Sequence, residues 1–477
     1  MASHIITMTK FFSLLIFSLY ISLSLPSLAS AFSPTDHYLI NCGSRAAETL
    51  DSDHRVFTGD ERRFLTSTGT IQLENAAVSS SELYHTATAF NRPTRYAFPI
   101  RDLGIHHLVR LHFHPIYYRY NNLIEAEFHV IANGFLLLRN FRVPNSDDFP
   151  MIKEFVIPID SEKLEITFLP SEKSKYGVVN AIEVISAPKD LIGDVAYVDS
   201  ESSEMINGLL KTGFETVHRV NVGGFKVTPF NDSLWRTWVT DDAYLKSSGD
   251  DDSKNMEPIH FGGRIKYQIG GASREVGPDN VYNTARVIKS VNNSIPNTNM
   301  TFVFAVEKGH NYLVRLHFCD IASVALGMLY FNVYMNGNLA FENLDLTYAT
   351  NSLLASPFYA DLLVNMQDSE VLVVSVGPSN MSLPRAVDAI LNGVEIWKTN
   401  NSMGSFDGEV CAESVWRVWR KEHVNVLLPL VAGVFLLLSA AMFIQKRRGG
   451  SVPWSRLPVD VSEDNLKFGN QFSSLKA

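Results

Sequence analysis

Short runs with alternating apolar and polar residues recur through most of the chain. Residues 108–113, Leu-Val-Arg-Leu-His-Phe, would place Val, the second Leu and Phe on one face of a strand and Arg and His on the other. Residues 164–169 and 371–376 predict further strands. Helical periodicity is largely confined to residues 205–217. The pattern therefore predicts an all-β fold.

Two Asn-Gly pairs stand between such runs. This dipeptide favours a two-residue type I′ hairpin, because both central residues of that turn need positive φ. The pairs are Asn133-Gly134, between residues 127–132 and 135–139, and Asn336-Gly337, between residues 330–335 and 338–341. We therefore expect an antiparallel hairpin at each position.

Five blocks of sequence occur twice, in the same order. Residues 108–113 return letter for letter as residues 313–318, at an offset of 205. The weaker pairs are 39–43 with 220–224, 84–87 with 282–285, 133–134 with 336–337, and 180–184 with 392–396. A fixed order with spacing that drifts by loop-sized amounts indicates two copies of one domain. Each copy should be an antiparallel β-sandwich of jelly-roll type. The expected divisions are a first domain at 32–187, a linker with a short helix at 188–215, and a second domain at 216–398.

Two apolar segments outside the copies predict a membrane topology. Lys10 precedes an apolar run that ends before Ala29-Ser-Ala31, which is the layout of a secretory signal peptide over residues 1–31. Residues 424–444 are 21 residues without charge, enough for a helix to cross the ~30 Å hydrocarbon layer. We expect a transmembrane helix there, a type I orientation in the plasma membrane, an extracellular juxtamembrane stalk at 399–423 and a short cytosolic tail at 445–477.

Charge narrows the class of partner. The whole chain carries a formal net charge of −9, and the part expected outside the cell, residues 32–423, holds 34 basic and 47 acidic residues. An acidic surface of net charge −13 does not suit nucleic acid as a general partner, whereas it would attract a basic peptide or protein.

Cysteines and glycosylation signals fit an exported protein. Three cysteines, Cys42, Cys319 and Cys411, allow at most one internal disulfide, and the apolar surroundings of Cys319 predict a buried side chain. Five Asn-x-Ser/Thr triplets mark possible glycosylation sites in the second half of the chain. They begin at Asn231, Asn292, Asn299, Asn380 and Asn400.

Several blocks carry a family resemblance. They are Tyr38-Leu-Ile-Asn-Cys-Gly-Ser, Val281-Tyr-Asn-Thr-Ala-Arg, Tyr312-Leu-Val-Arg-Leu-His-Phe-Cys-Asp and Asn392-Gly-Val-Glu-Ile-Trp. These blocks resemble malectin-like domains, and the tandem pair resembles the ectodomain of the plant receptor kinases that include FERONIA and THESEUS. The resemblance implies a receptor that binds a basic, cysteine-rich signalling peptide of the rapid alkalinization factor class, or cell-wall polysaccharide. The resemblance also implies a partner receptor kinase or a GPI-anchored co-receptor, with which the chain would form a signalling complex.

The resemblance stops before the kinase of that family. The Gly-rich loop, the His-Arg-Asp motif and the Asp-Phe-Gly motif of a kinase are all absent from residues 445–477. They are also absent from the rest of the sequence. The sequence therefore predicts no enzyme, and no Ser-His-Asp or His-Glu-x-x-His pattern suggests another activity. Two readings stay open: a receptor-like protein without its own kinase, or a truncated reading of a longer receptor serine/threonine kinase.

Three tyrosines are candidate ligand contacts. By resemblance, Tyr117 and Tyr118 fall where animal malectin stacks an aromatic pair on its sugar, and Tyr84 falls near another of its aromatic residues. The second copy has Ala322-Ser323 at the place of the pair. Such tyrosines can also be packing groups or protein contacts. If instead they hold a glycan, the chain is a lectin proper, which is the rival to the receptor reading.

Histidines near the repeated block invite a metal reading. His112 and His114 share a strand face, but no third ligand is evident. The same His returns in the second copy as His317, in each case two residues after an arginine. Recurrence favours a shared structural network on the sheet face, and we expect neither metal nor cofactor.

Overall fold

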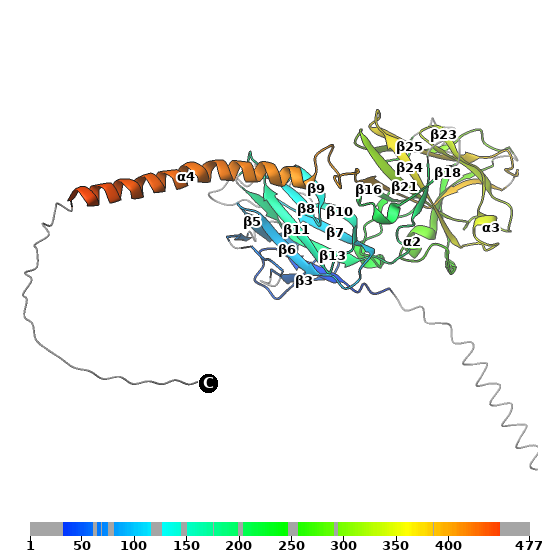
Figure 1. Ribbon diagram of the computed structural model, residues 1–477. Coiled ribbons are helices and arrows are strands. Elements are labelled where there is room, and N and C mark those ends of the chain that lie inside the picture. Colours follow the sequence, from blue (N-terminus) through cyan, green and yellow to red (C-terminus); the bar gives the residue numbers. More distant parts are fainter. Residues whose placement is uncertain are drawn as a thin grey trace, which may run out of the picture. The chain divides into compact units, whose positions relative to one another are not determined.

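The computed structural model describes residues 32–60, 64–67, 69–74, 81–115, 126–144, 150–174, 176–198, 204–246, 256–290, 294–384 and 386–448, the side chains of 421–431 and 448 excepted. The chain divides into two units, Met1–Trp416 and Arg417–Ala477. Strands dominate the first unit (Figure 1). Helix α4 (Ala412–Arg448) begins at the end of the first unit and makes up the described part of the second unit.

The first repeat comprises strands β1 to β13. They are β1 (His37–Asn41), β2 (Glu48–Leu50), β3 (Val56–Gly59), β4 (Ile71–Glu74), β5 (Thr86–Phe90), β6 (Thr94–Pro99), β7 (Ile105–Phe113), β8 (Glu127–Ala132), β9 (Phe135–Arg142), β10 (Met151–Ile159), β11 (Lys163–Pro170), β12 (Gly177–Val179) and β13 (Ala181–Ser186), with the 3-10 turn η1 (Glu82–Tyr84). The linker segment, residues 187–213, holds β14 (Val195–Val198), β15 (Met205–Asn207) and the 3-10 turn η3 (Leu209–Lys211).

The second repeat comprises strands β16 to β27. They are β16 (Phe214–Asn221), β17 (Val239–Thr240), β18 (Met256–His260), β19 (Thr284–Lys289), β20 (Met300–Ala305), β21 (His310–Cys319), β22 (Tyr330–Met335), β23 (Asn338–Asp345), β24 (Pro357–Met366), β25 (Val371–Pro378), β26 (Val387–Leu391) and β27 (Gly393–Thr399). Short helical turns η4 (Pro229–Asn231), α2 (Asp279–Tyr282) and α3 (Leu346–Ala349) connect them.

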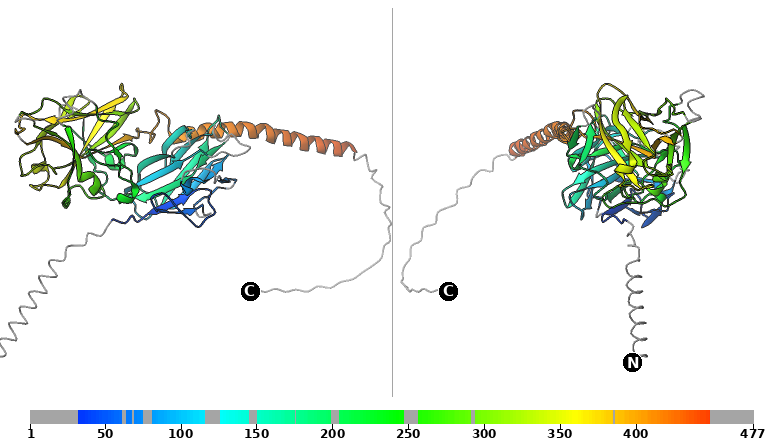
Figure 2. Two further views of the ribbon diagram at one scale, coloured as in Figure 1. Left: turned by 180° about the vertical axis from the view of Figure 1, so that it is seen from behind. Right: turned by 90° about the vertical axis from the view of Figure 1, so that its right-hand side faces the viewer.

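One sheet of 13 strands runs through both repeats. Its order is β15-β14-β24-β21-β27-β16-β10-β7-β13-β1-β3-β2, with β17 beside β16. The repeats meet where β10 pairs antiparallel with β16, Phe155 opposite Glu215 and Val156 opposite Phe214. The strands of the two repeats gather into separate groups on either side of this junction, as seen from the front in Figure 1 and from behind in Figure 2.

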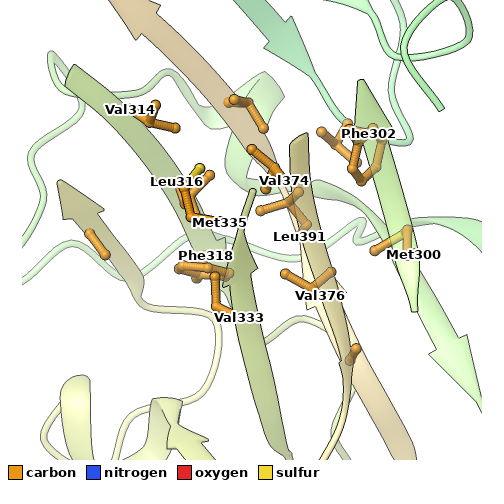
Figure 3. Packing of buried hydrophobic residues seen from close by; sticks show 14 of the residues in the cluster. Met300, Phe302, Val314, Leu316, Phe318, Val333, Met335, Val374, Val376 and Leu391 are labelled. Carbon is orange, nitrogen blue, oxygen red and sulfur yellow. The ribbon is translucent and has the colours of Figure 1, made fainter. Parts of the chain in front are cut away.

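A second layer of strands covers each repeat. In the first repeat it consists of β6-β11-β8-β9 and β12-β5-β4, and in the second of β20-β25-β22-β23 and β18-β19-β26. Apolar residues fill the space between the layers, since each strand sends alternate side chains inward. In the second repeat, Val314 and Leu316 of β21 face Val374 and Val376 of β25 across this core (Figure 3). The observed fold is therefore all-β, as predicted.

Both predicted hairpins form. Strands β8 and β9 flank Asn133 and Gly134, whose φ values are 43° and 92°. Strands β22 and β23 flank Asn336 and Gly337, with φ of 50° and 88°. Two positive φ values in succession are the signature of a type I′ turn, so turn chemistry fixed these connections. The predicted strands at 164–169 and 371–376 lie within β11 and β25.

The helical periodicity at 205–217 is not realised as a helix. Residues there form β15, the three-residue turn η3 and the start of β16. Phe214 and Glu215 pair with the edge of β10, a contact that local periodicity cannot register. The expected short linker helix is thus reduced to η3, and the domain limits 32–187 and 216–398 stay a prediction.

Several expectations concern the ends of the chain and its cysteines. Within the described residues, no helix combines the length and apolar character needed to cross a membrane, so the span expected at 424–444 is unconfirmed. The expected signal peptide, 1–31, and most of the expected tail, 445–477, lie outside the described residues. All three cysteines are free, and Cys319 is buried as predicted.

Candidate functional site

The same side-chain network is built twice on the shared sheet. In the first repeat, the hydroxyl of Tyr84 lies 2.9 Å from Nδ1 of His112, and Nε2 of His112 lies 2.8 Å from the carboxylate of Glu183. With Nε2 donating to the carboxylate, Nδ1 accepts from the tyrosine. Burial raises the pKa of Tyr84, so its hydroxyl stays protonated and can donate.

The second repeat reproduces this geometry. The hydroxyl of Tyr282 lies 2.9 Å from Nδ1 of His317, whose Nε2 lies 3.2 Å from Glu395. Burial lowers the pKa of His317, which keeps the ring neutral. The recurring histidine therefore belongs to a buried hydrogen-bond network, as the repeat predicted.

Arginines extend each network across the junction of the repeats. Arg110 donates to Glu154 at 2.6 Å, to Glu183 at 2.8 Å and to the carbonyl of Leu234, a residue of the second repeat, at 2.8 Å. Arg219 of the second repeat donates to the other oxygen of Glu154 at 2.7 Å and to Glu395 at 2.6 Å. Glu154 therefore joins an arginine of each repeat.

The charges in this network are almost fully shielded from water. The side chains of Arg110, Glu154 and Arg219 are 4%, 9% and 7% exposed. Burial alone would raise the pKa of Glu154 and Glu395, but the neighbouring arginines outweigh it. The pKa of Glu154 is lowered, and that of Glu395 falls to about 2.

A cleft of about 260 Å³ opens beside this network. Glu154 and Arg219 form part of its wall, and Trp235, Val239 and Tyr244 add apolar surface from the second repeat. We name it the junction cleft. The charged groups in its wall are already paired with one another, which leaves little free charge for a ligand.

Of the three tyrosines predicted to contact a ligand, Tyr84 alone lies within the described residues. Tyr84 is 7% exposed, its hydroxyl is bonded to His112, and its ring stacks on His112 and His114. In this conformation little of its ring is open to a ligand, and its contact with a ligand stays a prediction. Tyr117 and Tyr118 lie outside the described residues, so their contact with a ligand stays a prediction.

The structure also locates the histidines and the glycosylation signals. In the described ranges, no cluster of three or more His, Cys, Asp or Glu side chains is placed to hold a metal ion.

Of the five predicted glycosylation sites, Asn231, Asn299 and Asn380 are exposed. Asn400 is half-buried, accepts from the amide of Gly213 at 2.6 Å and donates to the carbonyl of Asn401 at 2.6 Å. Asn292 lies outside the described residues.

The junction residues were not identified from sequence. Glu154, Arg219 and Leu234 belong to no repeated block, and each contacts a partner more than 60 positions away. The repeated Arg-x-His pattern was the one available signal. It located one side of the network, but its partners across the junction depend on how the two repeats meet.

A sheet shared by two sandwiches that carry one buried network defines a class: a tandem-repeat, all-β module. Comparison with known proteins supplies the family. The malectin-like domain family matches residues 40–399, and the chain belongs to this family.

Curated relatives are receptor kinases of Arabidopsis thaliana. A probable receptor-like protein kinase is 41% identical over 420 residues, covering 86% of this chain and 48% of its own length. Receptor-like protein kinase THESEUS 1 is 36% identical over 84% of this chain and 46% of its own, and FERONIA is 32% identical over 83% and 46%. The chain thus spans about half the length of the curated relatives it matches, and the match does not include their kinase domain.

Solved structures give the same picture. The extracellular domain of ANXUR1 from Arabidopsis thaliana aligns with a TM-score of 0.68 at 26% identity, covering 78% of this chain and 98% of that one. A structure of the plant peptide RALF23 in complex with FER and LLG2 aligns with a TM-score of 0.66 at 32% identity, with coverage of 78% and 98%.

Proposed function

We propose that this chain is a single-pass receptor-like protein of the plasma membrane whose tandem malectin-like domains bind a ligand outside the cell. The ligand class is a secreted peptide of the rapid alkalinization factor type or a cell-wall polysaccharide. One observation carries the proposal: the FER ectodomain, crystallised with RALF23 and LLG2, aligns over 78% of this chain.

The topology is part of this proposal. A signal peptide at 1–31 would deliver the tandem domains to the cell exterior, and the uncharged stretch 424–444 would anchor them. Signalling would then pass through a partner receptor kinase, with a GPI-anchored protein as a further candidate partner. No enzymatic activity is proposed for the chain itself.

Charge supports a basic peptide as ligand. The net charge of −13 over residues 32–423 would raise the local concentration of a cationic peptide. The test is binding of rapid alkalinization factor peptides to the purified full-length chain at low and at high salt. We expect affinity to fall as salt screens the attraction. An absence of binding would refute the peptide as ligand, and equal affinity at both salt concentrations would refute the electrostatic part of the proposal.

A lectin is the second candidate, because Tyr117 and Tyr118 stay possible sugar contacts. A glycan array probed with the full-length chain tests it. Binding of a sugar that Tyr117→Ala abolishes, together with no binding of peptide, would favour the lectin. If no glycan is retained on the array, the lectin reading fails.

A further inference from the structure

The two repeats use equivalent edge strands differently. In the first repeat Glu154 of β10 lies opposite Arg110 of β7, and in the second Asp361 of β24 lies opposite Arg315 of β21. Strand β24 is thus the counterpart of β10. The outer edge of β10 receives β16 and with it the whole second repeat. The outer edge of β24 receives only β14 of the linker segment, so its cover is a two-stranded hairpin.

The hairpin is fixed to the second repeat on its inner side. Arg315 donates to the carbonyl of Leu191 at 2.7 Å and holds Asp361 through two bonds of 2.7 Å. Leu191, Ala196 and Leu209 are buried in an apolar cluster with Leu313. The hairpin is therefore a built part of the fold, on which a ligand could dock without first ordering it.

The outer side of the hairpin is open. Strand β15 ends the order of the 13-stranded sheet, and all three of its residues are exposed. Val198 donates to the carbonyl of Glu204, and Gly208 to that of Asp194, so alternation turns the N–H and C=O of Met205 and Asn207 away from β14. Unpaired groups along an exposed edge are a template for an added strand.

A pocket of about 690 Å³ lies over β14 and β24, one strand in from this edge. We name it the linker pocket. Val195 of β14 and Ile269 line it, and Ile269 is fully exposed although Gln268, its neighbour, is fixed by bonds of 2.7 Å to the carbonyl of Thr350 and the hydroxyl of Ser356. A fully exposed isoleucine on an anchored loop is apolar surface that a ligand can cover.

The charge at the linker pocket is negative. Asp190 and Asp194 line it and are exposed, and Glu204 precedes β15, while Lys189 is the one basic residue among the described residues of the lining. Asp361, also in the lining, is already neutralised by Arg315. The surplus of carboxylates favours a cationic ligand.

We propose that the linker pocket and the free edge of β15 together dock an extended, cationic peptide segment. Its backbone would pair with Met205 and Asn207, an apolar side chain would enter the pocket against Val195 and Ile269, and a flanking Lys or Arg would face Asp190. This location rests on the proposed function, since it assigns the peptide-binding role to one surface of the second repeat.

The experiment measures binding of synthetic RALF23, the peptide named in the FER complex, to the full-length chain and three variants. Asp190→Lys reverses a charge at the pocket. Met205→Pro removes an outward N–H from an edge strand, a position where proline is tolerated. Asp368→Lys makes the same charge change on an exposed residue just beyond the C-terminal end of β24 and serves as the matched control.

We expect Asp190→Lys and Met205→Pro each to weaken binding by about tenfold or more, and Asp368→Lys by about twofold or less. Thermal unfolding of each variant verifies the fold. Binding that is equal in all four proteins would overturn the location and leave the proposed function standing. No binding to the unsubstituted chain would overturn the location and, with it, the peptide part of the proposed function. Equal weakening by Asp190→Lys and Asp368→Lys would show long-range attraction only and would also overturn the location.

Discussion

Replacing Glu154 with glutamine tests whether the buried network holds the two repeats together. The change keeps the shape of the side chain and removes the charge between Arg110 and Arg219, whose side chains are 4% and 7% exposed. A glutamine amide also turns one N–H₂ group toward a guanidinium, where two donors face each other.

The expected loss of unfolding free energy depends on which carboxylates still pair with the two arginines after the substitution. Breaking a buried ion pair from one side costs about 3–5 kcal/mol. Arg110 retains Glu183, and Arg219 retains Glu395, so we expect the lower end, a loss of about 3 kcal/mol in the free energy of unfolding.

The assay is urea denaturation of the full-length chain followed by tryptophan fluorescence. Trp238 is a suitable reporter, because its ring lies 5.7 Å from the guanidinium of Arg219 and is fully buried. The control is Glu370→Gln, which removes an exposed pair with Lys308 at 3.7 Å and should cost less than about 0.5 kcal/mol. A loss below about 1 kcal/mol for Glu154→Gln, or equal losses for both variants, would refute the reasoning.

Three further predictions concern pH, backbone geometry and glycosylation. Burial lowers the pKa of His106 to about 4, so the unfolded chain binds the proton first and stability is lost as pH falls from about 6.5 toward 4; we expect His106 to contribute about 2 kcal/mol of the loss between pH 7 and 5 in urea titrations, so that His106→Gln loses about 2 kcal/mol less over that range, and equal losses in both proteins would contradict it. Gly43→Ala would place a Cβ 2.2 Å from the carbonyl oxygen of Ala87 at φ +79° and should lower the unfolding free energy by more than about 3 kcal/mol, whereas Gly104→Ala, at φ +73° in open space, should lower it by about 1–2 kcal/mol; similar losses would contradict the steric argument. Mass spectrometry of the exported chain should find glycan on exposed Asn231 and none on the hydrogen-bonded Asn400, and a fully occupied Asn400 would contradict the observed bonding.

The strands and hairpins were predictable because their causes are local. Alternating side chains at 108–113 and 313–318 identify the inward face of β7 and β21. Asn133-Gly134 selects its turn by the φ values that its own residues tolerate. In both cases the deciding interactions lie within a few residues of one another, so a short window of sequence contains them.

The junction was not predictable because its causes are remote. Residues 205–217 have a helical period, yet Phe214 extends against Val156 of a strand that ends 55 positions earlier. Glu154 belongs to no sequence motif, and it joins the two repeats only because the fold brings Arg219 to it from the other repeat. The same limit applies to the contact between Tyr84 and His112, which belong to two separate repeated blocks that only the fold brings together.

The repeated arginines show how duplication produced two unlike surfaces. Arg110 donates to the carbonyl of Leu234, 124 positions later, and Arg315 donates to that of Leu191, 124 positions earlier. The donor is the same in both repeats, but the first arginine captures a loop of a whole second sandwich and the other captures a linker. An edge that receives a sandwich is closed by it, whereas an edge that receives a short hairpin still has a free strand and an open pocket. One sequence pattern therefore specifies an internal interface at β10, whereas the equivalent edge at β24 is covered by β14 and the sheet ends at the outer edge of β15.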